Sequence, residues 1–309
     1  MNFFFFTGKG GVGKSTLAAA SAWQLSQKYR VLIVSLDPAH NLGDIFGVDI
    51  RGERRFSESL HLKEVDFKKQ AKAYLKKEIK TLSDTYKYLQ TLNLDTYFSV
   101  LKYSPGIEEY ALLTSIEETI HKRSDFDYII FDTPPTGLTL RFLALPQVTI
   151  TWIDRLIQIR QKILEKFYTI RRIRGPQSTA ETRLAYDEKD DELLQKLYSL
   201  KSGYQSLSRT LQGDDCSIAL VFNPDLLSLK ESLRLIEGLD ELHLPLRLLL
   251  HNKISPSNQE IAQQVEAEIC SRATAVQLMR IHLQSDFQKD KTSGLYDLGE
   301  DITRYLEWS

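Results

Sequence analysis

Short apolar runs alternate along this chain of 309 residues with longer segments in which apolar and polar residues recur at helical spacing. Runs of this length are typical of strands buried on both faces of a parallel sheet. Such strands are predicted at 3–6, 30–36, 127–132, 217–222, 246–250 and near 275–280. Helices are predicted at 17–28, after Asp225 through Ile236, near 259–272 and at 298–308. This alternation predicts an α/β fold built on a doubly wound, mostly parallel sheet.

Two further segments mix basic and apolar residues at helical spacing and predict amphipathic helices. They place a helical subdomain at about 67–103 and 151–213, beside a core of 1–66, 104–150 and 214–309. A helix with a broad apolar face either packs that face on its own core or exposes it to a hydrophobic partner, and the pattern leaves both open. In the second segment this face consists of Ile153, Leu156, Ile157, Ile163, Leu164, Phe167 and Ile170.

The composition is that of an ordinary globular protein, with 42% hydrophobic and 26% charged residues and a net charge of −1. No excess of positive charge points to a nucleic-acid partner. The chain has no run of about eighteen apolar residues and no signal-peptide pattern, so a cytoplasmic location is expected, with peripheral membrane attachment as the alternative. Because Cys216 and Cys270 form no C-x-x-C pair, neither a disulfide framework nor a zinc site is expected.

The first apolar run leads into GKGGVGKS at 8–15, which matches the phosphate-binding pattern G-x-x-x-x-G-K-[ST] in full. Glycines let the backbone amides of such a loop approach phosphate oxygens without a Cβ in the way, and the helix that follows directs its positive end at the same phosphates. We expect Lys14 to reach the β- and γ-phosphates and the Ser15 hydroxyl to bind Mg²⁺. The loop residues predicted to bind a nucleoside triphosphate are Gly8, Lys9, Gly10, Gly11, Val12, Gly13, Lys14, Ser15 and Thr16.

Two aspartates stand at the carboxyl ends of predicted strands, where ligands bind in parallel sheets. Asp37 is placed to orient or deprotonate the attacking water, although an aspartate before Pro38 also commonly opens a turn. Asn41 is expected to hydrogen-bond the γ-phosphate or that water. Asp132 is predicted to hold the water shell of Mg²⁺, with capping of the next turn as the alternative.

Several motifs occur in an order that matches one family of P-loop NTPases. They are GKGGVGKST at 8–16, DPAHNLGDIFG at 37–47, LKEVDF at 62–67, PGIEE at 105–109 and DYIIFDTPPTGLTLRFLALP at 127–146. In type and order they resemble the arsenite-pump and tail-anchored-protein-targeting ATPases, the ArsA/Get-type family. Lys9 is similar to the early lysine of the deviant Walker A loop, which MinD-type and nitrogenase-iron-protein-type ATPases share with this family.

The resemblance implies a nucleotide-binding core with an inserted helical subdomain, active as a homodimer that binds ATP and Mg²⁺. It implies that Lys9 reaches the partner's phosphates across the dimer, so that Lys9, Lys14 and Asp37 are the catalytic residues. It also places Asn252 against the adenine ring, where an amide both donates and accepts, although an asparagine after a strand also forms turns. Two switch segments are implied, made of Asp37, Pro38, Ala39, His40, Thr133, Pro135, Thr136 and Gly137.

The motifs and the resemblance together predict an ATP-hydrolysing homodimeric switch that handles a hydrophobic or membrane-protein client. One alternative is the catalytic subunit of an arsenite-type anion pump, but arsenite calls for clustered thiols and the chain has two cysteines. Another is a MinD-like protein that ATP positions on a membrane or partner.

Leu138 stands where family members generally have histidine. Leucine can neither hydrogen-bond nor titrate, which puts the coupling of the second switch segment to the helical subdomain in question.

Overall fold

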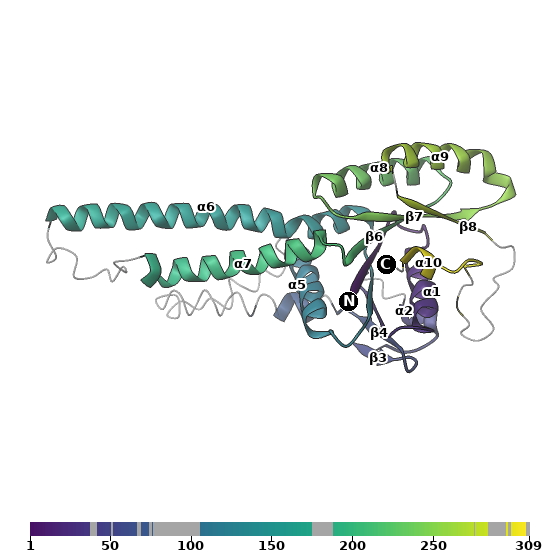
Figure 1. Ribbon diagram of the computed structural model, residues 1–309, viewed down its shortest axis with the longest axis horizontal. Helices are drawn as coiled ribbons and strands as arrows, with labels where there is room; N and C mark the ends of the chain where they lie inside the picture. The colour runs from purple at the N-terminus through teal and green to yellow at the C-terminus, as the bar shows by residue number, and fades with distance from the viewer. Residues whose placement is uncertain are drawn as a thin grey trace. The chain divides into compact units, whose positions relative to one another are not determined.

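The computed structural model of the chain describes residues 1–37, 42–50, 52–66, 69–73, 76, 106–174, 188–274, 276–283, 295 and 298–306. These residues fall into two compact units. The first contains the described residues of Met1–Leu143 and Gln212–Ser309, including the whole β-sheet, and the second contains those of Ala144–Leu211 (Figure 1). Most of the predicted helical segment 67–103 lies outside the described residues.

An eight-stranded sheet forms the centre of the first unit, in the order β3-β4-β2-β5-β1-β6-β7-β8. Among the described strands, β3 pairs antiparallel with β4 and all other neighbours are parallel. This arrangement confirms the predicted doubly wound, mostly parallel sheet. The strands are β1 (Asn2–Thr7), β2 (Val31–Ser35), β3 (Glu53–Arg55), β4 (Leu60–Glu64), β5 (Tyr128–Asp132), β6 (Cys216–Phe222), β7 (Leu246–Ile254) and β8 (Gln277–His282).

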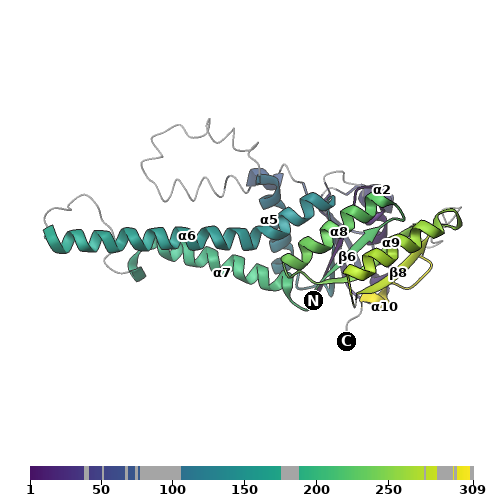
Figure 2. The same cartoon turned by 90° about the horizontal axis from the view of Figure 1, so that it is seen from above.

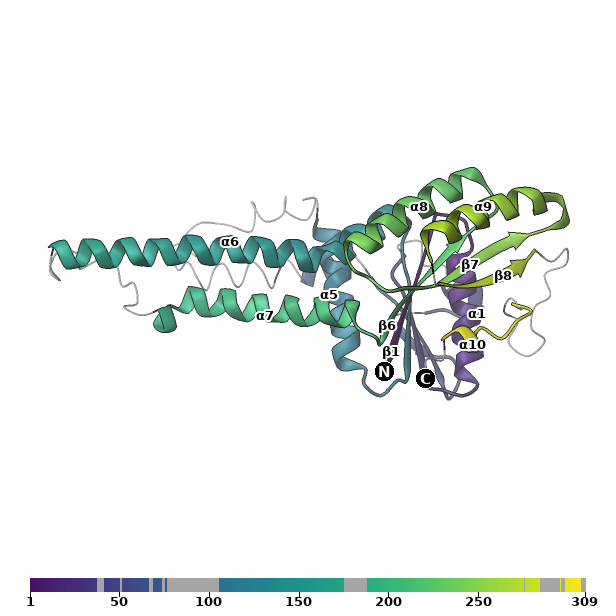
Figure 3. The same ribbon diagram turned by 45° about the horizontal axis from the view of Figure 1, so that its top comes forward.

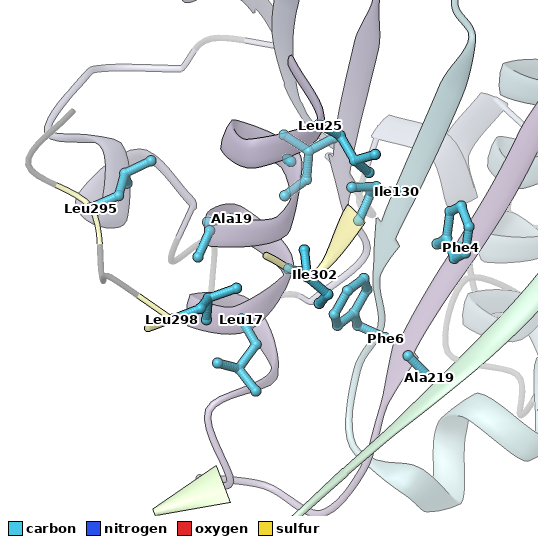
Figure 4. Packing of buried hydrophobic residues seen from close by; sticks show 14 of the residues in the cluster. Phe4, Phe6, Leu17, Ala19, Leu25, Ile130, Ala219, Leu295, Leu298 and Ile302 are labelled. Carbon is cyan, nitrogen blue, oxygen red and sulfur yellow. The ribbon is translucent and has the colours of Figure 1, made fainter. Parts of the chain in front are cut away.

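The four consecutive phenylalanines of β1 serve the cores on both faces of the sheet, because successive side chains of a strand point to opposite faces. Phe4 and Phe6 pack toward α1 (Figure 4), whereas Phe5 stacks on Phe131 of β5 with ring centroids 4.7 Å apart. The helices of the α1 face are α1 (Lys14–Ser26), α2 (Leu42–Phe46) and α10 (Thr303–Leu306). The residues labelled around the two phenylalanines in Figure 4 are Leu17, Ala19, Leu25, Ile130, Ala219, Leu295, Leu298 and Ile302.

Helices α8 (Leu226–Glu241) and α9 (Gln259–Arg272) cover the opposite face of the sheet, as Figure 3 shows. The carboxylate of Asp225 begins α8, where it accepts a hydrogen bond of 2.7 Å from the Ser228 amide and caps the helix. The first unit also contains α5 (Ile107–Lys122) and the short 3₁₀ turn η4 (Pro256–Asn258), while the 3₁₀ turn η3 (Glu188–Asp190) belongs to the second unit.

Several elements differ from the sequence predictions. Strand β7 continues past the predicted end at 250 to Ile254, because its last residues still pair with β8. The described part of the predicted closing helix at 298–308 is the short α10. Strand β3 was not predicted because all three of its residues are charged, and β4 was not predicted because it contributes only two buried leucines. Helix α5 was also not predicted, although it begins within the PGIEE motif at 105–109.

The second unit consists of most of α6 (Thr136–Arg174) and nearly all of α7 (Glu192–Gln212), which lie side by side in Figures 1 and 2. Two apolar stripes run along α6. The first is buried against α7 and consists of Ile153, Ile157 and Leu164, which pack on Leu194 and Leu197. The second, here named the exposed stripe, consists of Val148, Trp152, Leu156, Ile159 and Ile163. The broad apolar face predicted for this helix is therefore divided between a core and an open surface.

Within the described residues, no helix combines the length and the apolarity that a bilayer span needs.

An ion pair holds α7 against α6 in the second unit. The guanidinium of Arg160 donates to both carboxylate oxygens of Asp191, with Nε–Oδ1 at 3.2 Å and Nη2–Oδ2 at 2.7 Å. The same carboxylate accepts a hydrogen bond of 2.9 Å from the Leu194 amide and so caps the first turn of α7. The hydrogen bonds from Arg160, followed by those from the backbone, hold the pKa of this side chain below its ordinary value, although only 3% of the side chain is exposed.

Removing this carboxylate should destabilise the helical unit. Asp191→Asn leaves the Arg160 guanidinium without its counter-charge, and we expect a loss of roughly 2 to 4 kcal/mol in the free energy of unfolding. The matched control is Lys201→Met, which breaks the more exposed pair between Lys201 and Asp154 on the same two helices (Nζ–Oδ1 2.6 Å). It should change stability by less than about 1 kcal/mol. Urea unfolding followed by circular dichroism measures both.

The pH dependence of this difference follows from the lowered pKa of Asp191. A depressed folded pKa gives a stabilisation that is present above the unfolded value, near 3.8, and is lost as the pH falls through the folded value. The stability gap between the wild type and Asp191→Asn should therefore hold from about pH 7 to 5 and narrow below about pH 4. A gap that widens on acidification, or one no larger than that of the control, would contradict this role.

Candidate functional site

The predicted phosphate loop lies between β1 and α1 at the carboxyl edge of the sheet, where ligands bind in doubly wound folds. In the register of three adjacent strands, Asp132 of β5 stands beside both Phe6 of β1 and Ser35 of β2. Asp37 comes two residues after Ser35 in the chain. The sheet therefore brings the loop and these two aspartates to one edge.

Glycine is required at both ends of the phosphate loop by the structure around it. A Cβ on Gly8, whose φ is +147°, would lie 2.1 Å from the Val221 carbonyl oxygen of β6. A Cβ on Gly13, whose φ is +101°, would lie 2.5 Å from Nδ2 of Asn252. In the middle of the loop a Cβ on Gly10 would meet open space. The ends of the loop are thus fixed by packing, while its middle stays open to a ligand.

The first turn of α1 offers its backbone amides without competition from side chains. The residue at its N-cap is Gly13, which makes no side-chain cap, and the first turn contains no acidic residue. The leading amides of a helix have no partners within the helix and carry partial positive charge. This end of α1 therefore suits an anion such as phosphate.

Lys14 places a buried cation beside these amides. Its Nζ donates a hydrogen bond of 3.3 Å to the Lys9 carbonyl oxygen. Burial lowers the pKa of the ammonium, and the nearby carboxylates of Asp132, Asp37 and Glu231 oppose that shift. A phosphate in the loop would add the negative charge that a desolvated ammonium needs.

Asp132 places a buried carboxylate close to this cation. Burial raises its pKa to about 6, against the opposing effects of a hydrogen bond with Ser15 and of the charge on Lys14. Among the described residues its Oδ1 has no hydrogen-bond partner.

These oxygens fit a magnesium ion. Mg²⁺ prefers oxygen ligands and keeps several waters, so the Ser15 hydroxyl together with Asp132, acting directly or through water, suits it. In the described part of the chain, no group of three or more His, Cys, Asp or Glu side chains is arranged to hold a metal ion. An ion at this position would therefore take its remaining ligands from phosphate and water.

Asp37 is close enough to both buried charges to affect them: its negative charge raises the pKa of Lys14 and that of Asp132. Its backbone amide donates to the Ser35 hydroxyl at 3.4 Å, and the residue is only partly buried. A carboxylate at this position can accept a proton from water near the phosphates. The other residues of the first predicted switch segment, Pro38, Ala39 and His40, lie outside the described residues and stay predictions, as does the predicted phosphate contact of Asn41.

The second predicted switch segment is tied to β1 and folded into the start of α6. The Thr133 hydroxyl donates to the Phe6 carbonyl oxygen at 2.8 Å, and the Thr139 hydroxyl lies 3.1 Å from that of Thr133. Helix α6 begins at Thr136, so Thr136 and Gly137 belong to its first turn and not to a loop. A rearrangement at these two residues would therefore change the start of a helix.

Glu231 of α8 also belongs to the site, although no motif marks it in the sequence. Its carboxylate accepts a hydrogen bond of 3.1 Å from the Thr136 hydroxyl, and its charge acts on Lys14. In the sequence it is one polar position of an amphipathic helix. The helix places it between the phosphate loop and the start of α6, which no local pattern can reveal.

Lys9 makes a long ion pair within its own chain. Its Nζ lies 3.8 Å from Oδ1 of Asp225, the N-cap of α8, and both side chains are partly exposed. An exposed pair of this kind contributes about 0 to 1 kcal/mol. Lys9 can therefore leave this partner at little cost. The position of Asp225 just after a buried strand is the sequence signal that would have placed it here.

The end of β7 joins the phosphate loop through two side chains. Nδ2 of Asn252 donates to the Val12 carbonyl oxygen at 2.7 Å, and Nζ of Lys253 donates to the Gly11 carbonyl oxygen at 2.7 Å. Oδ1 of Asn252 accepts from the Lys253 amide at 2.9 Å. The predicted contact of Asn252 with adenine stays a prediction. Lys253 was not singled out in the sequence, and its place at a strand end is the only signal for it.

The site can be compared with known proteins on this basis. The family model for anion-transporting ATPases matches residues 1–294. A putative arsenical pump-driving ATPase 2 of Aquifex aeolicus (strain VF5) is 30% identical over 313 residues, which cover 99% of this chain and 99% of that protein. A putative arsenical pump-driving ATPase 1 of the same organism is 28% identical, covering 88% of this chain and 66% of the relative. ATPase get3 of Aspergillus terreus (strain NIH 2624 / FGSC A1156) is 30% identical over 261 residues, covering 82% of this chain and 73% of that protein.

Proposed function

The chain belongs to the anion-transporting ATPase family, and from that membership we propose that it is a homodimeric switch that couples ATP hydrolysis to the handling of a hydrophobic client. The observation that carries the proposal is a pair of buried, opposite charges, Lys14 and Asp132, at the open side of a loop of backbone amides. Within the described residues neither has a direct ion-pair partner. A triphosphate with its magnesium ion supplies a partner for each.

The residues of the site divide the work of hydrolysis between binding and proton transfer. Lys14, the loop amides and the start of α1 bind the phosphate oxygens, so that the triphosphate lies over the end of β1. Ser15 and Asp132 hold Mg²⁺, which supplies positive charge next to the phosphates. Asp37 orients the attacking water and accepts its proton, and Asn252 binds the adenine. The products are ADP and phosphate.

A dimer that closes on the nucleotide gives Lys9 a role in the site. Its pair with Asp225 is weak enough for the ammonium to turn to the phosphates of a second copy and add charge there. Leu226 and Leu227, the first residues of α8, are 61% and 56% exposed next to Asp225. Apolar side chains beside the site suit a contact between two copies of the chain.

The exposed stripe of α6 is the surface that we assign to the client, which we take to be an apolar helix of a membrane protein. Trp152 is 66% exposed and Ile159 is 53% exposed. From Val148 to Ile163 the stripe repeats at intervals of three and four residues, so it follows one side of α6 over roughly 22 Å. A partner helix with the same spacing can lie along it.

Two further features support this assignment. Exposed basic side chains beside the stripe, among them Arg155 and Lys162, suit work close to an anionic membrane surface. Helix α6 also contains Thr136 and Gly137 of the second predicted switch, so one helix carries both the switch and the stripe. We accordingly place the protein in the cytoplasm, acting beside a membrane.

Arsenite transport is the alternative that the names of two relatives suggest. Cys216 lies buried in β6, and burial raises the pKa of its thiol to about 12, while Cys270 lies on α9. Arsenite prefers several close thiolates, which the two cysteines of this chain cannot supply. Stimulation of ATP hydrolysis by arsenite would favour this alternative over client handling.

Asp37→Asn should stop hydrolysis and leave nucleotide binding intact, because the amide cannot accept the proton of the attacking water. We expect kcat to fall by about 10² to 10⁴ and the affinity for Mg²⁺–ATP to stay within about threefold. The matched control is Asp44→Asn, the same change at an exposed aspartate of α2, which should leave both unchanged. Phosphate release and titration calorimetry measure the two quantities. Undiminished turnover in Asp37→Asn would show that Asp37 does not accept the proton of the attacking water.

Ile159→Asp should abolish client binding without changing the ATPase, because it puts a charge in the centre of the exposed stripe. With a fluorescent apolar helical peptide of about 20 residues as probe, we expect binding to fall at least about tenfold. Gln158→Asp, which adds the same charge one position along the helix and off the stripe, is the control. Fluorescence anisotropy in the presence of ATP and Mg²⁺ reports binding, and phosphate release reports turnover. If the wild type did not bind the peptide, or if both variants bound it equally, the stripe would not be the client surface.

A further inference from the structure

The carboxyl end of β7 departs from regular strand geometry where it meets the phosphate loop. Three steps along β7, from His251 to Ile254, correspond to two steps along β8, so β7 has one extra residue here. Within this bulge Lys253 has a φ of +61°, in the left-handed region that residues other than glycine rarely adopt. Bulges next to functional sites redirect side chains, and a strained conformation persists only where its surroundings enforce it.

The bulge directs two neighbouring side chains to two consecutive carbonyls of the loop. Asn252 binds the Val12 carbonyl and Lys253 binds the Gly11 carbonyl, each at 2.7 Å. Carbonyls that are held on the outside of a loop leave its amides free to face an anion on the inside. The amine of Lys253 thus binds a carbonyl of the phosphate loop and not a group of its own strand.

His251, which directly precedes Asn252, packs the end of β7 against neighbouring elements. The imidazole is fully buried and stacks on Phe222, with ring centroids 4.5 Å apart. Its Nδ1 lies 3.2 Å from Oε2 of Glu266 on α9, and Arg280 of β8 donates to both oxygens of that carboxylate. These contacts tie the residue before the bulge to two neighbouring elements, so the strained lysine is held between fixed points.

We infer that Lys253 is a positioning residue for polyphosphate: its ammonium binds the Gly11 carbonyl and, with Asn252 on Val12, holds the phosphate loop in its anion-binding shape. The inference rests on the proposed function, because it takes the loop to be the site of a triphosphate. It differs from the predicted role of Asn252 at the adenine, which concerns the base. A ligand that has phosphates and no base separates the two roles.

Titration calorimetry of the full chain with Mg²⁺–ATP and, separately, with inorganic tripolyphosphate tests this. Lys253→Met removes the donor and should weaken both ligands by a similar factor of about ten. Lys253→Arg keeps a cationic donor and should stay within about threefold of the wild type. Lys166→Met, the same change at an exposed lysine of α6, is the control and should alter neither affinity.

Lys253→Gly distinguishes positioning from mere structural support. Glycine adopts a φ of +61° without strain, so this variant should melt about 2 to 4 °C above the wild type. It also lacks the amine, so it should bind tripolyphosphate as weakly as Lys253→Met does. Higher stability with weaker phosphate binding is a combination that a purely structural role does not produce.

Three results would overturn the inference. Unchanged tripolyphosphate affinity in folded Lys253→Met and Lys253→Gly would show that the amine does not shape the loop. Weaker ATP binding with unchanged tripolyphosphate binding would move Lys253 to the nucleoside. A wild type that binds neither ligand would overturn the proposed function together with the inference, whereas the first two results leave the proposed function standing.

Discussion

Two opposite charges, buried at the carboxyl edge of the parallel sheet, determine what the candidate site can bind. Lys14 and Asp132 are buried where the aromatic strand β1 ends, and one oxygen of the aspartate has no hydrogen-bond partner in the described part of the chain. A buried charge without full compensation is unfavourable by several kcal/mol, in order of magnitude. A magnesium-bound polyphosphate would compensate both charges, and the family of the chain agrees with that chemistry.

The phosphate loop beside these charges is shaped by its neighbours and not by its own residues alone. The Val221 carbonyl leaves no room for a side chain at Gly8, and the Asn252 amide leaves none at Gly13. The bulge of β7 adds the strained Lys253, whose left-handed conformation is unfavourable by about 1 to 3 kcal/mol and is retained where it meets the loop. Strands β6 and β7, which lie on one side of β1, thus hold the loop in its shape before any ligand arrives, which would keep the reorganisation on binding small.

The sheet could be predicted from the sequence, and the candidate site could be located in it, because both have local signatures. The run of phenylalanines and the motif that follows it are contiguous, and the α/β alternation shows in the period of the apolar residues. Contacts between distant segments leave no such trace: the pairing of Thr136 with Glu231 and that of Lys253 with Gly11 depend on how helices and strands are arranged. Strand β3 has no hydrophobic pattern, since it lies at the edge of the sheet and is entirely charged. The division of the apolar face of α6 depends on where α7 lies, so the sequence alone left a core and an open surface as alternatives.

In the proposed switch, two copies of the chain close on bound nucleotide, and Lys9 must leave Asp225 to reach the phosphates of the second copy. Sedimentation velocity of the full chain with Mg²⁺ and a non-hydrolysable ATP analogue, compared with Lys9→Ala, measures this most directly. The wild type should sediment as a dimer with analogue bound, and Lys9→Ala should bind the analogue while its dimer is lost or much weakened. A wild type that carries the analogue as a single copy, indistinguishable from Lys9→Ala, would contradict the proposed switch.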